Sequence, residues 1–560
     1  MGPGPPGAGY ASWRDLPRPD RTGPAPRHLV GGDRRTAGAD QRLASSPVRG
    51  GPAGAIALAG SGGGALALAF EPYAVLPLVV VGPTLFVLAL DDASLRRSVV
   101  LGFVFGLSFQ GLLLWWLTQS IGPAAWAAVV LVQAAWFGAL GFVAYLTRRL
   151  PVASVWFGLA WVTAETARST WPWGGLPWGR IGFAVLDTPW SGLLPVLGVA
   201  GTGVLLATVA AALADAVRLA GRARIRGLLG ASLLLVLGLV PALGARSGQL
   251  DSSVVVAVVQ GGVPGDGRQL AANHRQVTDN HALATMALAR RVEQGATPRP
   301  DIVVWPENST AVDPMRDGRA RAAIESAVEA IGVPVVVGAM VDGPTPDTVL
   351  NQGIVWAGSG PSAATYTKHH PVPFGEYIPF RRYLGSISPR LAEIRRDMLP
   401  GTSVQPLDVD GTTVADAICF DVAYDDVIAA QVRNGAELVI VQTSNASFTG
   451  TAQLDQQFAM TRARALETQR AVAVASTNGI TALIAPDGTV IERAPRERTA
   501  VLSARLPVSD DVTPAVRWET VPARIAVLLS LVGAVVGAWK LGAFRVLRRR
   551  TVGTTGRAQG

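Results

Sequence analysis

Apolar runs long enough to cross a membrane constrain the fold of this chain more than any other feature of its sequence. Crossing the hydrocarbon core of a bilayer takes about 20 apolar residues in helical form. The first and fifth runs are short, and the others are close to this length. The runs lie at 53–70, 74–90, 98–118, 123–146, 152–167, 191–214, 227–245 and 522–544. The pattern predicts eight transmembrane helices, seven before a long intervening segment and one after it.

The composition agrees with a membrane protein and argues against a nucleic-acid partner. Hydrophobic residues make up 49% of the 560 positions and charged residues only 16%, which is too apolar for an ordinary soluble protein. The net charge is +9. Arginine is concentrated in the N-terminal tail, the short loops between apolar runs and the last few residues. Membrane orientation produces this placement, so we expect no nucleic acid to bind.

The basic loops predict how the chain is oriented. Cytoplasmic loops carry an excess of Lys and Arg, and such residues occur at 91–97, 148–149 and 218–226 but not at 71–72. With the Arg-rich tail inside, seven spans place the chain after about residue 246 outside the cytoplasm. The predicted division is a disordered cytoplasmic tail at 1–52, a seven-span domain at 53–246, an extracytoplasmic domain at 247–510, a linker and last span at 511–545, and a cytoplasmic tail at 546–560.

A tryptophan-rich loop separates the fifth and sixth runs. Trp171, Trp173 and Trp178 lie within eight residues of one another. Tryptophan is enriched at the headgroup level of membranes, so this segment is predicted to be an interfacial or re-entrant loop. Two interpretations stay open, an ordinary aromatic belt and a surface that contacts lipid substrates.

The segment from 254 to about 507 has the pattern of an α/β domain. Short β-branched runs alternate with helical stretches, and fully apolar strands interleaved with helices indicate sheets that helices cover. The expected strands are 254–260, 301–305, 333–341, 413–418, 438–442 and 471–477, and the expected helices are 269–294, 319–331, 425–433 and 453–469. A hairpin is expected through Pro486-Asp487-Gly488.

Cys419 is the only cysteine of the chain and lies between a predicted strand and a predicted helix. A lone cysteine forms no disulfide within the chain, so it is either a small buried hydrophobic residue or a chemical group. A thiol acts as a nucleophile only as thiolate, and it therefore needs a base or a cation beside it.

Two other segments carry ionisable groups at the ends of strands. Glu307 follows the strand 301–305, where α/β folds place functional groups. Lys368, His369, His370 and Glu376 lie in a stretch rich in proline that fits neither a helix nor a central strand. Adjacent histidines are expected to point in different directions, so we predict no metal site. A glutamate, a lysine and a cysteine suit acyl transfer, although their spacing alone does not show that they converge.

These motifs resemble the carbon–nitrogen hydrolase (nitrilase) superfamily. The resemblance is carried by Trp305-Pro306-Glu307, by the run from Lys368 to Glu376 and by Cys419-Phe420-Asp421, in this order. Together with the apolar runs, the stretch from Val372 to Pro379 is similar to apolipoprotein N-acyltransferases of the bacterial cytoplasmic membrane. The similarity covers roughly residues 53–545.

The resemblance implies a polytopic α-helical membrane domain and an extracytoplasmic α-β-β-α sandwich. It implies Glu307 as general base, Cys419 as nucleophile and Lys368 as the group that stabilises the tetrahedral intermediate. Glu376 would orient Lys368 and assist proton transfer. Asp421 stands where the family often has glutamate and Phe420 where it often has tyrosine, so both are expected to support the site without a tyrosine hydroxyl.

The implied reaction moves an acyl chain from a membrane phospholipid to Cys419 and then to the α-amine of a diacylglyceryl apolipoprotein. No cofactor is implied, the partners are lipid-anchored, and the protein is expected to act as a monomer in the bilayer. Arg462 and Arg464 are expected to be structural or to contact headgroups.

Two alternatives remain at this stage. A membrane-tethered amidase would use the same triad and pass its acyl group to water. A transporter or receptor with an external sensing domain is a different class, but transporters usually carry ionisable residues in mid-span. Here Glu165, near the end of a run, is the main such residue.

Overall fold

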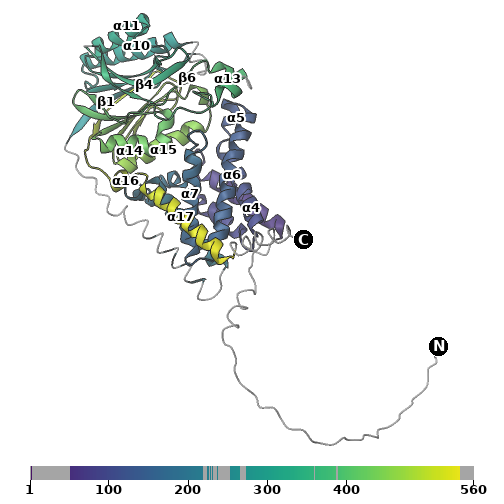
Figure 1. Cartoon of the computed structure of the whole chain (residues 1–560). Helices are drawn as coiled ribbons and strands as arrows, with labels where there is room; N and C mark the ends of the chain where they lie inside the picture. Colours follow the sequence, from purple (N-terminus) through teal and green to yellow (C-terminus); the bar gives the residue numbers. More distant parts are fainter. Residues whose placement is uncertain are drawn as a thin grey trace, which may run out of the picture. The chain divides into compact units, whose positions relative to one another are not determined.

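The computed structural model describes residues 51–218, 252–264, 273–358, 360–385 and 389–542, with a few isolated positions elsewhere (Figure 1). The predicted tails at 1–52 and 546–560 and the seventh apolar run, 227–245, fall almost entirely outside these residues. The predictions for them are therefore untested.

Apolar helices form the part of the chain before residue 219. They are α2 (Pro52–Leu68), α3 (Leu78–Ala89), α4 (Leu95–Leu113), α5 (Leu117–Ser120), α6 (Pro123–Thr147), α7 (Ala153–Thr170) and α8 (Leu194–Arg218), with the 3₁₀ turns η1 (Ile181–Val185) and η2 (Pro189–Leu193) before α8. Near the C-terminus, α16 (Pro514–Trp518) leads into α17 (Val521–Lys540). Among the described residues, three helices are long and apolar enough to cross a membrane, at 123–147, 189–218 and 521–540. The count of eight spans stays a prediction.

Glycine allows these helices to approach closely. A methyl group added to Gly63 of α2 would lie 2.2 Å from the carbonyl oxygen of Phe105 in α4. One added to Gly102 of α4 would lie 2.1 Å from the carbonyl oxygen of Phe137 in α6. In a bilayer the hydrophobic effect does not drive helices together, because the lipid tails are as apolar as the side chains. Small residues at helix contacts are the usual means of close packing there.

Two sheets lie face to face in the C-terminal part. The first has the order β13-β1-β2-β3-β4-β5 with β6 beside β4, and the second has the order β12-β11-β10-β9-β8-β7. The strands of the first sheet are β1 (Ser253–Gln260), β2 (Ile302–Val304), β3 (Val335–Asp342), β4 (Thr348–Ala357), β5 (Gly360–Thr367), β6 (Asp397–Met398) and β13 (Ala500–Pro507). Those of the second are β7 (Leu407–Val409), β8 (Thr412–Ile418), β9 (Leu438–Thr443), β10 (Val472–Ser476), β11 (Ala482–Ile484) and β12 (Val490–Arg493).

Helices cover the outer face of each sheet, which confirms the predicted α-β-β-α sandwich. In Figure 1, α10 (His274–Glu293) and α11 (Gly318–Ile331) lie on one side, and α14 (Asp426–Arg433) and α15 (Gln453–Thr468) lie on the other. Alternate side chains of β8 and β9 join α14, α15 and the N-terminal helices in one hydrophobic core, while the remaining ones fill the space between the sheets. The short helices α12 (Arg381–Leu384) and α13 (Pro389–Glu393) lie in the segment before β6.

The strands that were predicted agree with β1, β2, β3, β8, β9 and β10, and the hairpin through Gly488 joins β11 and β12. The sequence did not predict β4, β5, β6, β7 or β13. Strand β4 carries Asn351 and Gln352, and β5 is exposed over much of its length, so neither has the continuous apolar pattern of the buried strands.

Polar contacts fasten α15 and the Cys419 turn to the N-terminal helices. Gln456 of α15 accepts hydrogen bonds from the indoles of Trp116 (3.0 Å) and Trp178 (2.6 Å). The half-buried Asp425 accepts from the buried Arg180 (2.7 Å) and Arg464 (2.9 Å). Burial alone would raise the pKa of Asp425, but the two guanidinium groups hold it well below its ordinary value.

Arg464 is thus structural, as expected. Arg462 pairs with Asp187 (2.6 Å), a residue just before η2, so it also joins the two parts of the chain.

Neutralising Asp425 should destabilise the protein strongly. In Asp425→Asn, Arg180 and Arg464 keep their charge in a buried site, and breaking such a pair costs about 3–5 kcal/mol of unfolding free energy. Because the pKa of Asp425 is lowered in the folded state, the stabilisation is present near neutral pH and is lost as the pH falls. Thermal unfolding in detergent at several pH values measures both effects.

The control is Glu325→Gln, which removes the partner of Arg321 on an exposed helix face. It should change the unfolding free energy by less than about 0.5 kcal/mol. Equal effects of the two substitutions would contradict the role given to Asp425.

Candidate active site

Cys419 begins the 3₁₀ turn η3 (Cys419–Ala423) directly after β8. Its φ is +51°, in the left-handed region that a side chain with a Cβ rarely adopts. Its Sγ lies 3.9 Å from Oε1 of Gln457 on α15, and Gln457 donates to the Cys419 carbonyl oxygen (3.4 Å). Residues held in such conformations cluster at functional sites, so the turn after β8 makes Cys419 a candidate functional residue.

The first sheet contributes a buried ion pair to the same site. Glu307 follows β2, Lys368 follows β5, and the Lys368 Nζ donates to Oε1 of Glu307 at 3.1 Å. The side chain of Lys368 is 0% exposed and that of Glu307 is 3% exposed. A second pair of contacts holds the glutamate, from Asn351 Nδ2 to Oε1 (2.7 Å) and from the Ser444 amide to Oε2 (2.8 Å).

Glu376 completes the coordination of the lysine. Its Oε1 accepts from Lys368 Nζ at 2.6 Å, and its Oε2 accepts from the amide of Val372 at 2.7 Å. The hydrogen bond to the Val372 amide closes the loop on itself. Lys368 thus lies between the carboxylates of Glu307 and Glu376. The structure therefore brings Glu307, Lys368 and Glu376 together, as predicted.

The electrostatics keep the lysine charged and the thiol neutral. Burial, reinforced by Glu307 and Glu376, raises the pKa of Cys419 to about 12, although Lys368 opposes the rise. Burial would lower the pKa of Lys368, but the two carboxylates raise it well above its ordinary value. Burial raises the pKa of Glu376 despite the attraction of Lys368. A thiol with this pKa is protonated at neutral pH and needs a base to become a nucleophile.

Asp421 fastens the lysine loop to the cysteine turn. Its Oδ2 accepts from the Tyr366 hydroxyl (2.7 Å) and the Ile418 amide (3.2 Å), and its Oδ1 accepts from the His370 amide (2.9 Å). These groups lie on both sides of Lys368 and just before Cys419. Asp421 thus positions the two loops.

The ring of Phe420 stacks on Trp178 with centroids 6.1 Å apart. Trp178 is 2% exposed and hydrogen-bonded to Gln456, so it is part of the protein interior. Trp171 is 65% exposed and Trp173 is 41% exposed. The predicted interfacial loop therefore presents two of its three tryptophans at the surface.

Several residues of the site were not found by sequence reasoning. Asn351, Ser444 and Gln457 contact Glu307 or Cys419, and Asn445 donates to Gln457 at 3.1 Å. A buried asparagine in a strand, as at Asn351, is a signal that could have been used. Ser444 acts through its backbone amide, which no side-chain motif reveals.

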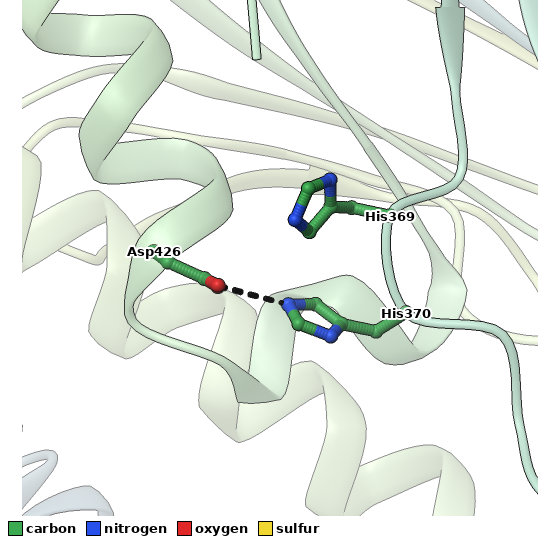
Figure 2. Close-up of side chains that lie close together, drawn as sticks. All are labelled: His369, His370 and Asp426. Carbon is green, nitrogen blue, oxygen red and sulfur yellow. Dashed lines mark hydrogen bonds and ion pairs between the residues drawn. The ribbon is translucent and has the colours of Figure 1, made fainter. Parts of the chain in front are cut away.

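His369, His370 and Asp426 lie close together (Figure 2). The expectation that the adjacent histidines point apart is wrong, because Figure 2 shows both imidazoles beside Asp426. One ligand atom from each lies within 4.8 Å of the others.

His370 already has other partners in this arrangement. Its Nε2 lies 2.9 Å from Oδ1 and 3.1 Å from Oδ2 of Asp426, and its ring stacks on Tyr424 at 3.7 Å. We describe the group as a hydrogen-bonded cluster beside the lysine loop. That the protein needs no metal stays a prediction.

Both parts of the chain match known protein families. Residues 62–213 match the model of the apolipoprotein N-acyltransferase N-terminal domain, and residues 255–511 match that of carbon-nitrogen hydrolase. Apolipoprotein N-acyltransferase of Mycolicibacterium smegmatis is 33% identical over 81% of this chain and 80% of its own length. That of Pseudomonas putida is 30% identical over 88% of this chain and 97% of its own length.

Solved structures also align with part of the chain. An amidase from Nesterenkonia sp. AN1 is 20% identical, covers 45% of this chain and 93% of its own, and has a TM-score of 0.32. A carbon-nitrogen hydrolase from Helicobacter pylori is 15% identical, covers 46% and 89%, and has a TM-score of 0.34.

The reactivity of Cys419 should show its raised pKa. With a pKa of about 12, the thiolate fraction at pH 7 is very small. Alkylation by iodoacetamide should therefore be slow at pH 7 and should rise about tenfold per pH unit up to about pH 10. Because the chain has one cysteine, the mass of the intact protein reports this site alone.

The control for this experiment is Cys419→Ala, which should gain no mass. Lys368→Met should slow the reaction further, because the ammonium group lowers the pKa of the thiol. A rate that levels off below about pH 9 would contradict the assigned pKa, since it would mark a thiol that titrates in the ordinary range.

Proposed function

The chain belongs to the apolipoprotein N-acyltransferase family, and we propose that Glu307, Lys368 and Cys419 carry out its acyl transfer. It is an acyltransferase of the carbon–nitrogen hydrolase superfamily and a membrane protein, and its acceptor is an apolipoprotein. The single observation that supports the assignment is Lys368 buried between Glu307 and Glu376 beside the only cysteine. Membership of this family excludes the alternative that the protein is a transporter or receptor.

In the first half of the proposed reaction, Glu307 takes the proton of the Cys419 thiol. The thiolate attacks the ester carbonyl carbon of a membrane phospholipid, and the ammonium group of Lys368 stabilises the oxyanion that forms. The carbon–oxygen bond of the ester then breaks. Glu307 returns its proton to the leaving alkoxide, and a lysophospholipid departs from the acyl thioester.

In the second half, the free α-amine of the diacylglyceryl-cysteine attacks the thioester carbonyl. Glu307 takes a proton from the attacking nitrogen, and the carbon–sulfur bond breaks. Glu307 then returns this proton to the leaving thiolate, which restores the Cys419 thiol. The product is an amide. One acid–base group serves both halves, so ping-pong kinetics are expected.

Glu376 has a supporting role in this proposal. Its short contact with Lys368 keeps the ammonium group in place while Glu307 changes its protonation. Asp421 and Phe420 support the cysteine turn, the first through the lysine loop and the second through Trp178.

We further propose that the protein spans the cytoplasmic membrane several times, acts as a monomer and has the catalytic domain, at about 247–510, on the extracytoplasmic side. The basic loops between apolar runs support this orientation. Phospholipid donors and lipid-anchored acceptors both lie in the bilayer. The contacts of Gln456 and Asp425 with the N-terminal helices hold the catalytic turn close to those helices. A membrane-tethered amidase that uses water remains the alternative for the acceptor step.

Substitution of the triad should abolish transfer at defined steps. Cys419→Ala should transfer no acyl chain and form no thioester. Glu307→Gln preserves the shape of the side chain but removes the base, and activity should fall by about 10²- to 10⁴-fold. The N-terminal mass of a diacylglyceryl lipoprotein, incubated with phospholipid and purified protein, measures the transfer.

Without acceptor, the wild-type protein should gain the mass of one acyl chain on Cys419. The exposed Glu325→Gln is the matched control for Glu307→Gln and should keep full activity. Full transfer by Cys419→Ala would refute the mechanism, and release of free fatty acid in place of acylated lipoprotein would favour the amidase.

The exposed tryptophans should affect the use of lipid substrates. Trp173 packs its ring on Phe374 of the lysine loop with centroids 5.4 Å apart, and Trp171 lies two residues before it at the surface. Trp171→Ala and Trp173→Ala should raise KM for phospholipid about three- to tenfold, because an interfacial aromatic contributes about 1 kcal/mol.

The control is Trp518→Ala, which removes a tryptophan of α16 whose exposure, 57%, lies between those of Trp171 and Trp173. If activity were unchanged in Trp171→Ala and Trp173→Ala, the loop would be an ordinary aromatic belt. Trp178 is unsuitable for this test, since its replacement removes the hydrogen bond to Gln456.

A further inference from the structure

A buried carboxyl group lies between the two sheets, behind the proposed triad. Asp416 of β8 shares the inner face of its strand with Val414 and Ile418, which belong to the hydrophobic core between the sheets. It is 0% exposed. Among the described residues, neither of its carboxyl oxygens has a hydrogen-bond partner of normal geometry, although the adjacent Ala417 amide lies close enough to interact with the carboxyl group.

Gln442 of the neighbouring strand β9 has an unpaired oxygen at the same place. Its Nε2 donates to the carbonyl oxygen of Trp305 (2.6 Å), while its Oε1 has no partner among the described residues. A methyl group added to Gly353, on β4 of the opposite sheet, would lie 1.9 Å from Oδ2 of Asp416 and 2.8 Å from Oε1 of Gln442. The two oxygens therefore lie close together, and only a glycine at position 353 leaves room for them.

Two unpaired acceptor oxygens in an apolar interior are unfavourable, and a negative charge on one of them is more so. A proton on Asp416 removes the charge and supplies the missing donor. We propose that Asp416 is a neutral carboxylic acid that hydrogen-bonds Gln442 and thereby positions the strand ends that carry the active site.

The placement of the three residues explains why this bond would matter for catalysis. Asp416 lies three residues before Cys419 on β8. Gln442 lies two residues before Ser444, whose amide binds Glu307. The third member, the carbonyl of Trp305, lies two residues before Glu307 itself. One chain of hydrogen bonds from β8 through β9 to β2 thus sets the positions of nucleophile and base across the two sheets.

Two carboxylates that face Asp416 favour its neutral form, Asp421 from the cysteine turn and Glu307 from the end of β2, whereas the amide of Ala417 favours the charged form. Tyr366 of β5 also interacts with Asp416, and its raised pKa keeps its hydroxyl uncharged. Burial, followed by the charge of Asp421, raises the pKa of Asp416 well above its ordinary value. On α14, Gln431 contacts only the backbone of Asp416 and carries no charge.

A pair of substitutions separates the proton from the shape of the side chain. Asp416→Asn is neutral at every pH and retains an N–H donor for Gln442. Asp416→Leu fills a similar volume but offers no donor. Asp416→Asn should keep kcat within about threefold of wild type, whereas Asp416→Leu should lose at least about tenfold, since it leaves a buried acceptor unpaired. KM for phospholipid should change little in either variant.

The second measurement is the pH dependence of thermal unfolding, which does not depend on the triad. A group whose folded pKa is raised stabilises the fold below its unfolded pKa, and this contribution is lost as the pH rises through the folded value. The wild type should therefore lose stability relative to Asp416→Asn as the pH is raised above about 4. The other titrating groups contribute equally to the unfolding free energies of both proteins, so their contributions cancel in the difference between the two.

The outcomes are distinct. A stability difference that is constant with pH would show that Asp416 is ionised or unimportant, and would overturn the proposal. Loss of activity in Asp416→Asn as large as in Asp416→Leu would overturn the positioning role. If Asp416→Leu does not fold, the pH-dependent comparison with Asp416→Asn still decides. The positioning role rests on the proposed triad, which the Cys419→Ala experiment tests separately.

Discussion

The interaction on which this site depends is a lysine cation enclosed between two carboxylates. A charge is stable in a protein interior only when it is paired and hydrogen-bonded, and Lys368 is fully buried. Glu307 and Glu376 supply that pairing, and each is itself held by backbone amides, from Ser444 and Val372. The loop after β5 therefore adopts the conformation that brings Glu376 to the charged ammonium group of Lys368.

Helix α15 relates this site to the N-terminal helices. Consecutive residues of a helix point about 100° apart. Gln456 is accordingly directed at Trp116 and Trp178, whereas Gln457 contacts Cys419. The same turn of helix thus contacts the apolar half of the chain on one side and the proposed nucleophile, Cys419, on the other. Such a joint suits an enzyme whose substrates are anchored in the bilayer.

Much of the fold and the triad could be predicted from the sequence, because both leave local signals. Buried strands are continuous apolar runs, and Glu307, Lys368 and Cys419 lie in short motifs beside strand ends. Strands β4 and β5 were missed because their polar and exposed residues interrupt that pattern. The amide of Ser444 was missed because it acts through the backbone.

Contacts between residues that are far apart in the sequence could not be predicted either. Asp416 and Gly353 are adjacent only because two sheets meet there, and no spacing along the chain indicates it. Asp421 stands three residues after Ile418, yet its partners include the hydroxyl of Tyr366 on β5 of the other sheet and the amide of His370 in the loop after β5. A motif identifies such a carboxylate, and only the fold shows that it joins two loops.

The charge balance of the site explains how a thiol with a raised pKa can still react. With both carboxylates in their charged form, Lys368 and the two glutamates together carry one negative charge. Releasing the thiol proton to water would bring the buried charge to minus two, which is what the raised pKa of Cys419 expresses. Transfer of the same proton to Glu307 leaves the total unchanged. The arrangement therefore disfavours a free thiolate in the resting enzyme, while it leaves open the one proton transfer that the proposed mechanism needs.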